Sequence, residues 1–202
     1  MDIDKDSLAE LVERLMRRSS AYLDLISATT EEEFEFSFTA ILESGLLHLE
    51  RNKRLFAGLT EEGLSAVLAA SLTGPGMIVT QETNSNGHVD LTIEADHCSP
   101  VMVKLCEAKI YAGPSYHIKG IAQLLGRYTT GRETRGLLLS YVRKPNIKDL
   151  VARLRAAVEK RLPENQIGPC QDHVLKWSFV TKHKHSSGEE LALSHVGCNM
   201  HV

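Results

Sequence analysis

Apolar residues in the first third of the chain recur every three or four positions, which is the period of an amphipathic helix. They predict three helices, over about residues 8–26, 30–56 and 60–72. Thr29 or Thr30 is expected to cap the second helix, because three glutamates follow in its first turn. The buried face of that helix is expected to carry Phe34, Phe38, Ile41, Leu42, Leu46 and Leu49.

From residue 77 the period changes to two, which is typical of strands. Residues 77–82 and 88–96 predict two strands joined by the turn Asn84-Ser85-Asn86-Gly87. Residues 101–110 are apolar on both faces, and this pattern predicts a strand in the middle of a covered sheet.

The remaining segments alternate between helix and strand patterns. They predict a helix over residues 115–130 that buries Ile118, Ala122 and Leu125, a strand over 136–142, a basic helix that ends at Leu162, and a hairpin of strands over 174–181 and 190–196. The order of elements predicts an α/β fold with a mixed sheet flanked by helices. We expect an N-terminal helical region over residues 1–59 and a second domain over residues 60–202.

Composition is that of a globular protein, with 43% apolar and 24% charged residues among 202. No apolar run approaches the ~20 residues that span a bilayer. The acidic N-terminus is unlike a secretory signal, and four cysteines without dense pairing suit a reducing compartment. We therefore expect a soluble, cytoplasmic protein without a membrane partner.

Charge is distributed unevenly along the chain. Residues 1–103 carry 7 basic and 18 acidic side chains, whereas residues 104–161 carry 13 basic and 4 acidic ones. The tail, residues 162–202, is close to neutral. The middle third is therefore a candidate surface for an anionic partner, although a solvated basic helix explains part of the excess.

Charged residues interrupt the most apolar strand. Glu107 and Lys109 are two positions apart, so both side chains project from one face of a strand that is otherwise apolar. Asp90, on the preceding strand, can lie beside Glu107 in a hairpin. Two carboxylates at the end of neighbouring strands repel each other unless a cation lies between them, and such oxygen-rich sites suit Mg²⁺ or Mn²⁺.

The sequence Gly87-His88-Val89-Asp90, followed by Glu107-Ala108-Lys109, resembles the PD-(D/E)xK nuclease superfamily, with Val89 at the place of the proline. The resemblance covers about residues 60–143 and implies a restriction-endonuclease-like fold. It implies that Asp90, Glu107 and the backbone carbonyl of Ala108 hold Mg²⁺, for which Mn²⁺ can substitute. Lys109 is then expected to lie near the attacking water.

Two further features match this family. Some of its branches carry a glutamine on the helix after the acid-x-Lys strand, followed by an aromatic residue, as Gln123 and Tyr128 do here. Such a glutamine contacts the lysine or the scissile phosphate. A glutamate from the helix before the first strand often joins the metal site; Glu62 is the first candidate. Behind it come Glu61, Glu43 and, on the first strand, Glu82.

Candidate contacts to nucleic acid follow from charge and spacing. Lys119, Gln123 and Arg127 share one stripe of the helix over residues 115–130. Tyr128 and Arg132 follow directly, and Arg135, Arg143 and Lys144 can extend a basic track along a phosphate backbone. A plain solvated face is the alternative explanation of Lys119 and Arg127.

The C-terminal region offers a rival metal site. Cys170-x-x-His173 and Cys198-x-x-His201 have a spacing that zinc can use, and His183, His185 and His195 lie between them. These pairs flank predicted strands instead of knuckle loops, so buried cysteines and surface histidines are the simpler interpretation. The sequence contains no glycine-rich phosphate loop and no Gly-x-Ser-x-Gly elbow.

Together these features predict a Mg²⁺-dependent nuclease that hydrolyses phosphodiester bonds, most simply in DNA, within a phage-defence or repair system. We expect a homodimer or a subunit of a larger complex, with the acidic N-terminal helices in the contact. The alternatives are a nuclease-like module that binds nucleic acid or a partner without cutting, a zinc-stabilised interaction module, and RNA as the substrate.

Overall fold

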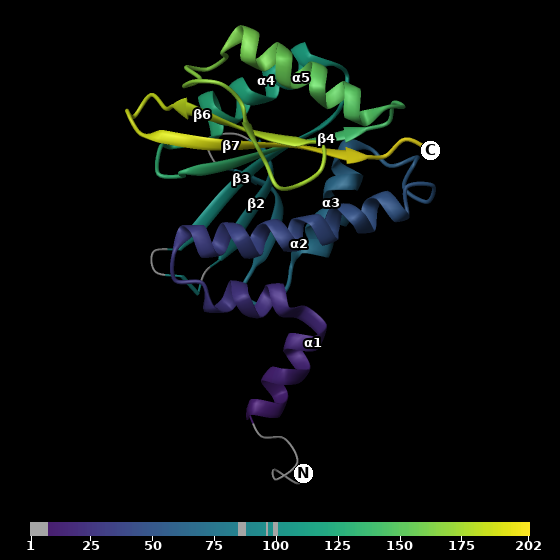
Figure 1. The fold of residues 1–202 in the computed structure, drawn as a ribbon, viewed down its shortest axis with the longest axis vertical. Helices are drawn as coiled ribbons and strands as arrows, with labels where there is room; N and C mark the ends of the chain where they lie inside the picture. Colours follow the sequence, from purple (N-terminus) through teal and green to yellow (C-terminus); the bar gives the residue numbers. More distant parts are fainter. Residues whose placement is uncertain (1–7, 85–87, 96, 99–100) are drawn as a thin grey trace.

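The structure, a computed structural model, describes residues 8–84, 88–95, 97–98 and 101–202. Its strands form a seven-stranded mixed sheet in the order β1-β2-β3-β4-β7-β6-β5 (Figure 1). The strands are β1 (Ile78–Asn84), β2 (His88–Ala95), β3 (Met102–Ile110), β4 (Arg135–Val142), β5 (Gln171–Asp172), β6 (Ser178–Lys184) and β7 (Glu190–Asn199). The helices are α1 (Leu8–Ser27), α2 (Glu31–Arg51), α3 (Glu61–Leu72), α4 (Pro114–Gln123), the π-helix η2 (Leu124–Tyr128) and α5 (Ile147–Arg161).

The predicted α/β class and the central position of the third strand are confirmed. β3 pairs with β2 in antiparallel and with β4 in parallel orientation, so it has a neighbour on each side. β7 then enters between β4 and β6 and runs parallel to β4. A strand with two neighbours and two covered faces needs apolar residues on both faces, as the sequence pattern indicated.

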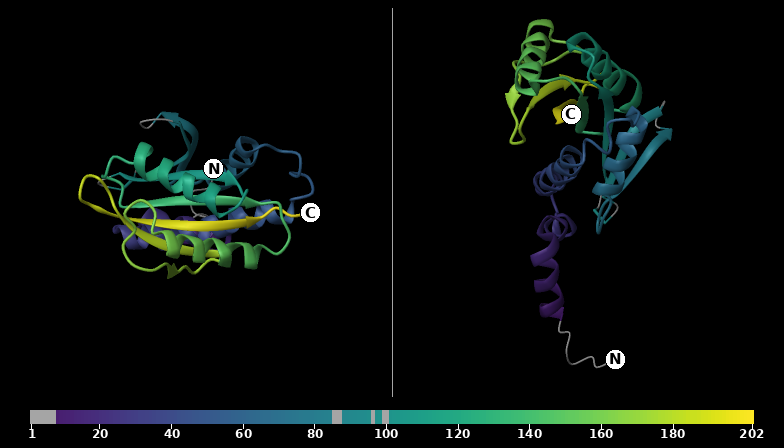
Figure 2. Two further views of the ribbon diagram at one scale, coloured as in Figure 1. Left: turned by 90° about the horizontal axis from the view of Figure 1, so that it is seen from above. Right: turned by 90° about the vertical axis from the view of Figure 1, so that its right-hand side faces the viewer.

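Helices cover both faces of the sheet (Figure 2). On one face α4, η2 and α5 pack against a cluster that includes Leu138, Phe179 and Val158. On the other face α2, α3 and the C-terminal half of α1 pack against a cluster that includes Phe38 and Leu68. The second cluster crosses the predicted boundary at residue 59, so α2 shares its core with the sheet.

The N-terminal helices have side-chain caps at their starts, and α2 has the buried face that the sequence predicted. Thr30 caps α2 in a capping box with Glu33, and the Thr60 hydroxyl accepts a hydrogen bond from the backbone N–H of Gly63 at the start of α3. All six apolar residues assigned to the buried face of α2 are buried. No helix in the described ranges combines the length and the apolar composition of a membrane span.

Two predictions about local structure were wrong in detail. The helix over residues 115–130 is α4 continued by η2. Leu125 is buried as predicted, but Ile118 and Ala122 are only half-buried, and the buried face centres on His117, Ile121 and Leu124. β6 begins at Ser178 instead of residue 174, because Trp177 has a φ of 54° and interrupts the extended chain. The predicted turn after Asn84 lies outside the described residues at positions 85–87.

A chain of buried polar side chains crosses the sheet on the α4 side. His117 bonds to Ser140 at 2.9 Å and to His195 at 2.8 Å, and His195 continues to Thr181 at 2.8 Å. Thr181 also bonds to His183 at 2.7 Å. Burial lowers the pKa of His117 to about 3, so the ring stays neutral in the folded protein.

This burial predicts a loss of stability in acid. The unfolded chain binds a proton at His117 below about pH 6.5 and the folded chain does not, so unfolding is favoured as the pH falls from 6.5 towards 3. Between pH 7 and 5 we expect the free energy of unfolding to fall by about 2 kcal/mol from this ring alone. Urea titrations of His117→Asn should show a pH dependence smaller by that amount, whereas the exposed His201→Asn should match the wild type. An unchanged pH dependence in His117→Asn would refute a neutral buried ring.

A second buried charge ties α2 to the sheet. The Lys104 ammonium is 3% exposed, lies 4.4 Å from the centroid of the Phe38 ring and forms an ion pair with Glu35. Burial lowers the pKa of Lys104, and Glu35 opposes that change. An ammonium in this position depends on its partner, because removing one member of a buried pair leaves an uncompensated charge.

We therefore expect Glu35→Gln to lower the free energy of unfolding by about 3–5 kcal/mol. Adding Lys104→Met to that variant should restore most of the loss, because the methionine is apolar and of similar length. The half-exposed pair of Glu31 and Arg135 is the matched control, and Glu31→Gln should cost less than about 1 kcal/mol. Equal costs for Glu35→Gln and Glu31→Gln, measured by urea titration, would contradict this account.

Candidate functional site

The acidic residues of the predicted motif meet where the pairing of β2 with β3 ends. The last paired residues are Leu91 and Cys106, so Asp90 and Glu107 are the next residues on the two strands. The Asp90 carboxylate accepts a hydrogen bond of 2.7 Å from the backbone N–H of Ala108. The Asp90 side chain thus accepts the hydrogen bond that a backbone carbonyl of β2 would accept if the strand pairing continued. This bond fixes Asp90 beside β3.

Glu107 is the most buried charged group of the site, with 1% of its side chain exposed. The Lys109 ammonium lies 2.6 Å from one carboxylate oxygen, yet neither oxygen accepts a well-angled hydrogen bond from a described residue. Burial raises the pKa of Glu107 to about 7, with Lys109 opposing the rise and Asp90 adding to it. A carboxylate in this state gains from any further cation or donor that reaches it.

Lys109 is surrounded by three carboxylates. Its ammonium lies 2.6 Å from Glu107, 3.5 Å from Glu61 and 3.9 Å from Asp90. Burial alone would lower the pKa of Lys109, but these carboxylates raise it above its ordinary value. The lysine therefore stays protonated, and the cluster still carries an excess of negative charge when all its acids are ionised.

The helix that precedes the first strand contributes Glu61. One oxygen of Glu61 accepts a hydrogen bond of 2.6 Å from the backbone N–H of Ile110, and the other faces Lys109. Glu62, the first candidate from the sequence, is exposed, and its backbone carbonyl accepts a bond from the Gln81 amide. The structure thus brings Glu61 to the site.

The spacing within α3 contains the signal that distinguishes these two acids. Glu61 precedes the buried Leu64, Leu68 and Leu72 by 3, 7 and 11 positions and so lies at the centre of the buried stripe, whereas Glu62 lies at its edge, in line with the small Ser65 and Ala69. Glu43 lies on α2 beside Val174, in a different part of the molecule. The side chain of Glu82, on β1, lies outside the described part of the structure.

Asp90 and Glu107 are the two carboxylates of the site that could hold a hard divalent cation. The two residues are adjacent, and the buried oxygens of Glu107 have the Lys109 ammonium 2.6 Å away but no well-angled hydrogen bond from a described residue. The N–H and C=O of a strand residue point to the same edge, so the Ala108 carbonyl is directed to the side of Asp90. Within the described ranges, however, no group of three or more His, Cys, Asp or Glu residues is arranged to hold a metal ion.

Helix α4 lies directly over Glu107. A Cβ placed on Gly120 would lie 3.7 Å from Glu107 Cγ and only 2.9 Å from Leu138, so the absence of a side chain here permits the close approach. Gln123 follows one turn later, half-buried and without a side-chain hydrogen bond to any described residue. Its amide is therefore available to a ligand at this end of α4.

The π-turn after Gln123 determines where the following residues point. Tyr128 is buried, and burial raises the pKa of its hydroxyl, with a further contribution from Glu107 and Asp90. Lys119 and Arg127 are exposed on α4 and η2. Single π-turns within helices are frequent at functional sites, because they re-aim side chains relative to the helix.

The remaining basic residues of the predicted track are not assembled at the site. Arg132 lines a cavity with residues 101–104, at the opposite end of β3, about 17–26 Å along the strand from Lys109. Arg135 pairs with Glu31, and Arg143 donates to the backbone carbonyl of Leu59. Lys144 is exposed beyond the end of β4.

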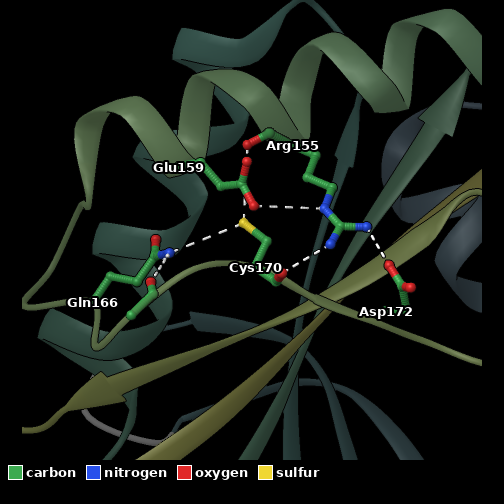
Figure 3. A network of polar contacts seen from close by, with 6 residues as sticks. Arg155, Glu159, Gln166, Cys170 and Asp172 are labelled. Carbon is green, nitrogen blue, oxygen red and sulfur yellow. Dashed lines mark hydrogen bonds and ion pairs between the residues drawn. The ribbon is translucent and has the colours of Figure 1, made fainter.

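Several cysteines and histidines of the rival zinc site have other partners. Cys170 contacts the Gln166 amide and the carbonyl of Arg155, within a network that joins the segment before β5 to α5 (Figure 3). His173 accepts a bond from the backbone of Leu175. All four cysteines are free thiols, and three are buried. These contacts agree with the expected buried cysteines, but the surface position expected for the histidines is wrong for His183 and His195, which are each 1% exposed and bond to Thr181 within the sheet.

Comparisons of the chain with protein-family models, with curated proteins and with solved structures gave no match. The case for a function therefore rests on the geometry around Asp90, Glu107 and Lys109.

Proposed function

We propose that this protein is a metal-dependent nuclease of the PD-(D/E)xK type that hydrolyses phosphodiester bonds in DNA. The observation that carries the proposal is the buried Glu107 carboxylate, which lacks a well-angled hydrogen bond and lies between Asp90 and Lys109 at the end of two strands. Lys109 compensates part of the cost of burying this carboxylate, and a bound cation would compensate more of it.

Asp90, Glu107 and the Ala108 carbonyl would hold one Mg²⁺, or Mn²⁺ in its place. When bound, the ion lowers the pKa of a coordinated water and offsets charge that develops on the phosphate. Lys109, protonated and 13% exposed, would donate hydrogen bonds to the attacking water or to a phosphate oxygen. Glu61 holds Lys109 in place and, through the N–H of Ile110, joins α3 to the end of β3.

The surroundings of the site support a polyanionic substrate. Lys119 and Arg127 are exposed on the elements that cover Glu107, where their charges can contact phosphates on either side of the scissile bond. Gln123 can steady Lys109 or the substrate from the end of α4. The antiparallel β1-β2-β3 meander and the parallel β4 after α4 are consistent with a restriction-endonuclease-like core.

One observation favours a second candidate, a nuclease-like module that binds nucleic acid or a partner without cutting. The Lys109 ammonium lies among the acids that would hold the ion, and the described residues offer no third ligand of the usual metal-binding types. Metal binding would then be absent, although the basic surface of α4 would still attract phosphates.

Cleavage assays separate the two candidates. Plasmid, single-stranded DNA and RNA should be offered with Mg²⁺ or Mn²⁺, and we expect cutting of DNA that EDTA stops. Glu107→Gln, Asp90→Asn and Lys109→Ala should each lower the rate by at least about 100-fold, because each removes a charge used in the reaction. Lys182→Ala, an exposed change on β6 outside the predicted basic track, is the control that should keep wild-type activity.

Each other outcome has a definite meaning. Cutting that survives Glu107→Gln and Lys109→Ala would contradict the assignment of the site. A wild-type protein that binds DNA, cuts none of the substrates and binds no Mn²⁺ in a direct titration would favour the non-cutting module.

The two adjacent glutamates of α3 form a matched pair for a second prediction. Glu61→Gln should lower the cleavage rate by about 10-fold or more, because it removes a charge that holds Lys109, and Glu62→Gln should have little effect. A larger loss in Glu62→Gln than in Glu61→Gln would refute the role given to Glu61. Urea titrations of both variants would show whether the loss reflects stability.

A further inference from the structure

The N-terminal half of α1 is a short amphipathic helix that projects from the body of the protein (Figure 1). The backbone leaves helical geometry at Ser19, where φ is −155° and ψ is 53°, and this kink separates Leu8–Arg18 from the rest of α1. Every side chain described between Ala9 and Arg18 is exposed. We call residues 8–18 the arm.

The arm carries an apolar face without cover. Leu11, Val12 and Met16 are 50%, 40% and 56% exposed and share one side, while the ion pairs Glu10–Arg14 and Glu13–Arg17 lie on the other. A helix of this length is only marginally stable alone in water, and most helices in proteins depend on packing of their apolar face. We therefore expect the apolar face of the arm to pack against another protein surface.

A groove of about 460 Å³ lies on the body, between α2 and the strands β6 and β7. Thr39 and Ala40 supply small side chains on α2, which let another helix approach closely. Phe36 and Val174 stand at its sides, 77% and 87% exposed, and are among the most exposed large apolar residues described. The groove thus has the apolar walls and the small floor residues that an amphipathic helix needs.

The arm and the groove each carry a charge that the other complements. Of the charged residues that border the groove, Glu35 pairs with Lys104, Asp172 with Arg155 and Arg135 with Glu31, which leaves Glu43. The arm carries three arginines against two glutamates. Arg18 on the arm and Glu43 on the groove each lack an ion pair within the described part of the chain. Such complementarity favours the arm as the occupant over an acidic segment.

The arm does not reach the groove of its own chain. The C-terminal half of α1 is held by a 2.9 Å hydrogen bond from the Tyr22 hydroxyl to the Leu72 carbonyl and by the bond of His97 to the Leu25 carbonyl. From this anchored half the arm runs away from the sheet (Figure 2). A second copy of the chain is then the source of the helix that fills the groove.

We propose that two copies of this protein form a dimer in which each arm lies in the groove of the other copy. The arrangement is reciprocal, so one twofold axis satisfies both arms and both grooves. Because each contact occurs twice, the buried area doubles towards the ~1,200–2,000 Å² of stable interfaces.

The mass in solution tests the proposal directly. Light scattering after size exclusion, at about 50 μM protein, should give twice the 22.4 kDa of one chain. The arm variant Leu11→Asp/Met16→Asp and the groove variant Phe36→Asp/Val174→Asp should each be monomeric. All four positions are exposed, so folding should be retained, which circular dichroism and thermal unfolding would verify. Leu55→Asp, a change at an apolar residue 79% exposed elsewhere, should leave the dimer intact.

Mixing the two variants distinguishes this dimer from other dimers. The intact arm of the groove variant can enter the intact groove of the arm variant, so the mixture should form a weak dimer that neither variant forms alone. A monomeric wild type would overturn the proposal. So would a dimer that only the arm changes disrupt, which indicates arm against arm, or one that only the groove changes disrupt.

Discussion

The burial of one carboxylate in the core of the sheet is the constraint on which the candidate site depends. Glu107 occupies a position of β3 that the fold covers on both sides, yet its oxygens lack well-angled hydrogen bonds from the described residues. A buried anion of this kind costs several kcal/mol unless cations compensate it. Lys109 supplies part of that compensation. Glu61 and Asp90 then hold Lys109 at the end of the strand.

β3 uses the same pair of residue types twice, with different results. Near its start, Lys104 pairs with Glu35 of α2, is 3% exposed and lies against the Phe38 ring. Near its end, Lys109 pairs with Glu61 of α3, is 13% exposed and faces two further acids. The first pair is covered by neighbouring side chains and joins α2 to the sheet. The second has more negative charge than its lysine can neutralise and reaches solvent, which are the properties of a binding site.

The sequence predicted what depends on local periodicity. Alternation identified β2, and apolar runs identified β3 and β4; the two-sided apolar pattern of β3 also predicted its place inside the sheet. The exposure of the first half of α1 could not be predicted. Leu11 and Met16 have the spacing of a buried helix face, and the kink at Ser19 that turns this half away from the body does not alter that spacing. The late start of β6 depends on a positive φ at Trp177, a conformation that residue type does not predict.

The sequence predicted that three residues of the site would lie together, but it did not predict which other residues surround them. Asp90, Glu107 and Lys109 lie on adjacent strands, so a hairpin register suffices to bring them together. The position of Arg132 depends on which end of β3 the loop after η2 passes. The sequence pattern does not determine the course of this loop in the folded protein. Glu61 could have been preferred to Glu62 from its place on the stripe of Leu64 and Leu68.

The groove for the arm and the basic residues of α4 and η2 lie on opposite faces of one sheet, so a dimer and a bound nucleic acid can coexist. The groove for the arm is formed by α2 with Val180, Ala192 and Ser194, whereas α4 and η2 cover the face that carries Lys119 and Arg127. A dimer joined through the arms thus leaves the basic face of each copy open. The strands of duplex DNA run antiparallel and are related by local twofold axes, so under the proposed nuclease function a twofold dimer would present one site to each strand in the same chemical sense. A single copy, with one Asp90–Glu107 pair, would present one such site and would act on one strand at a time.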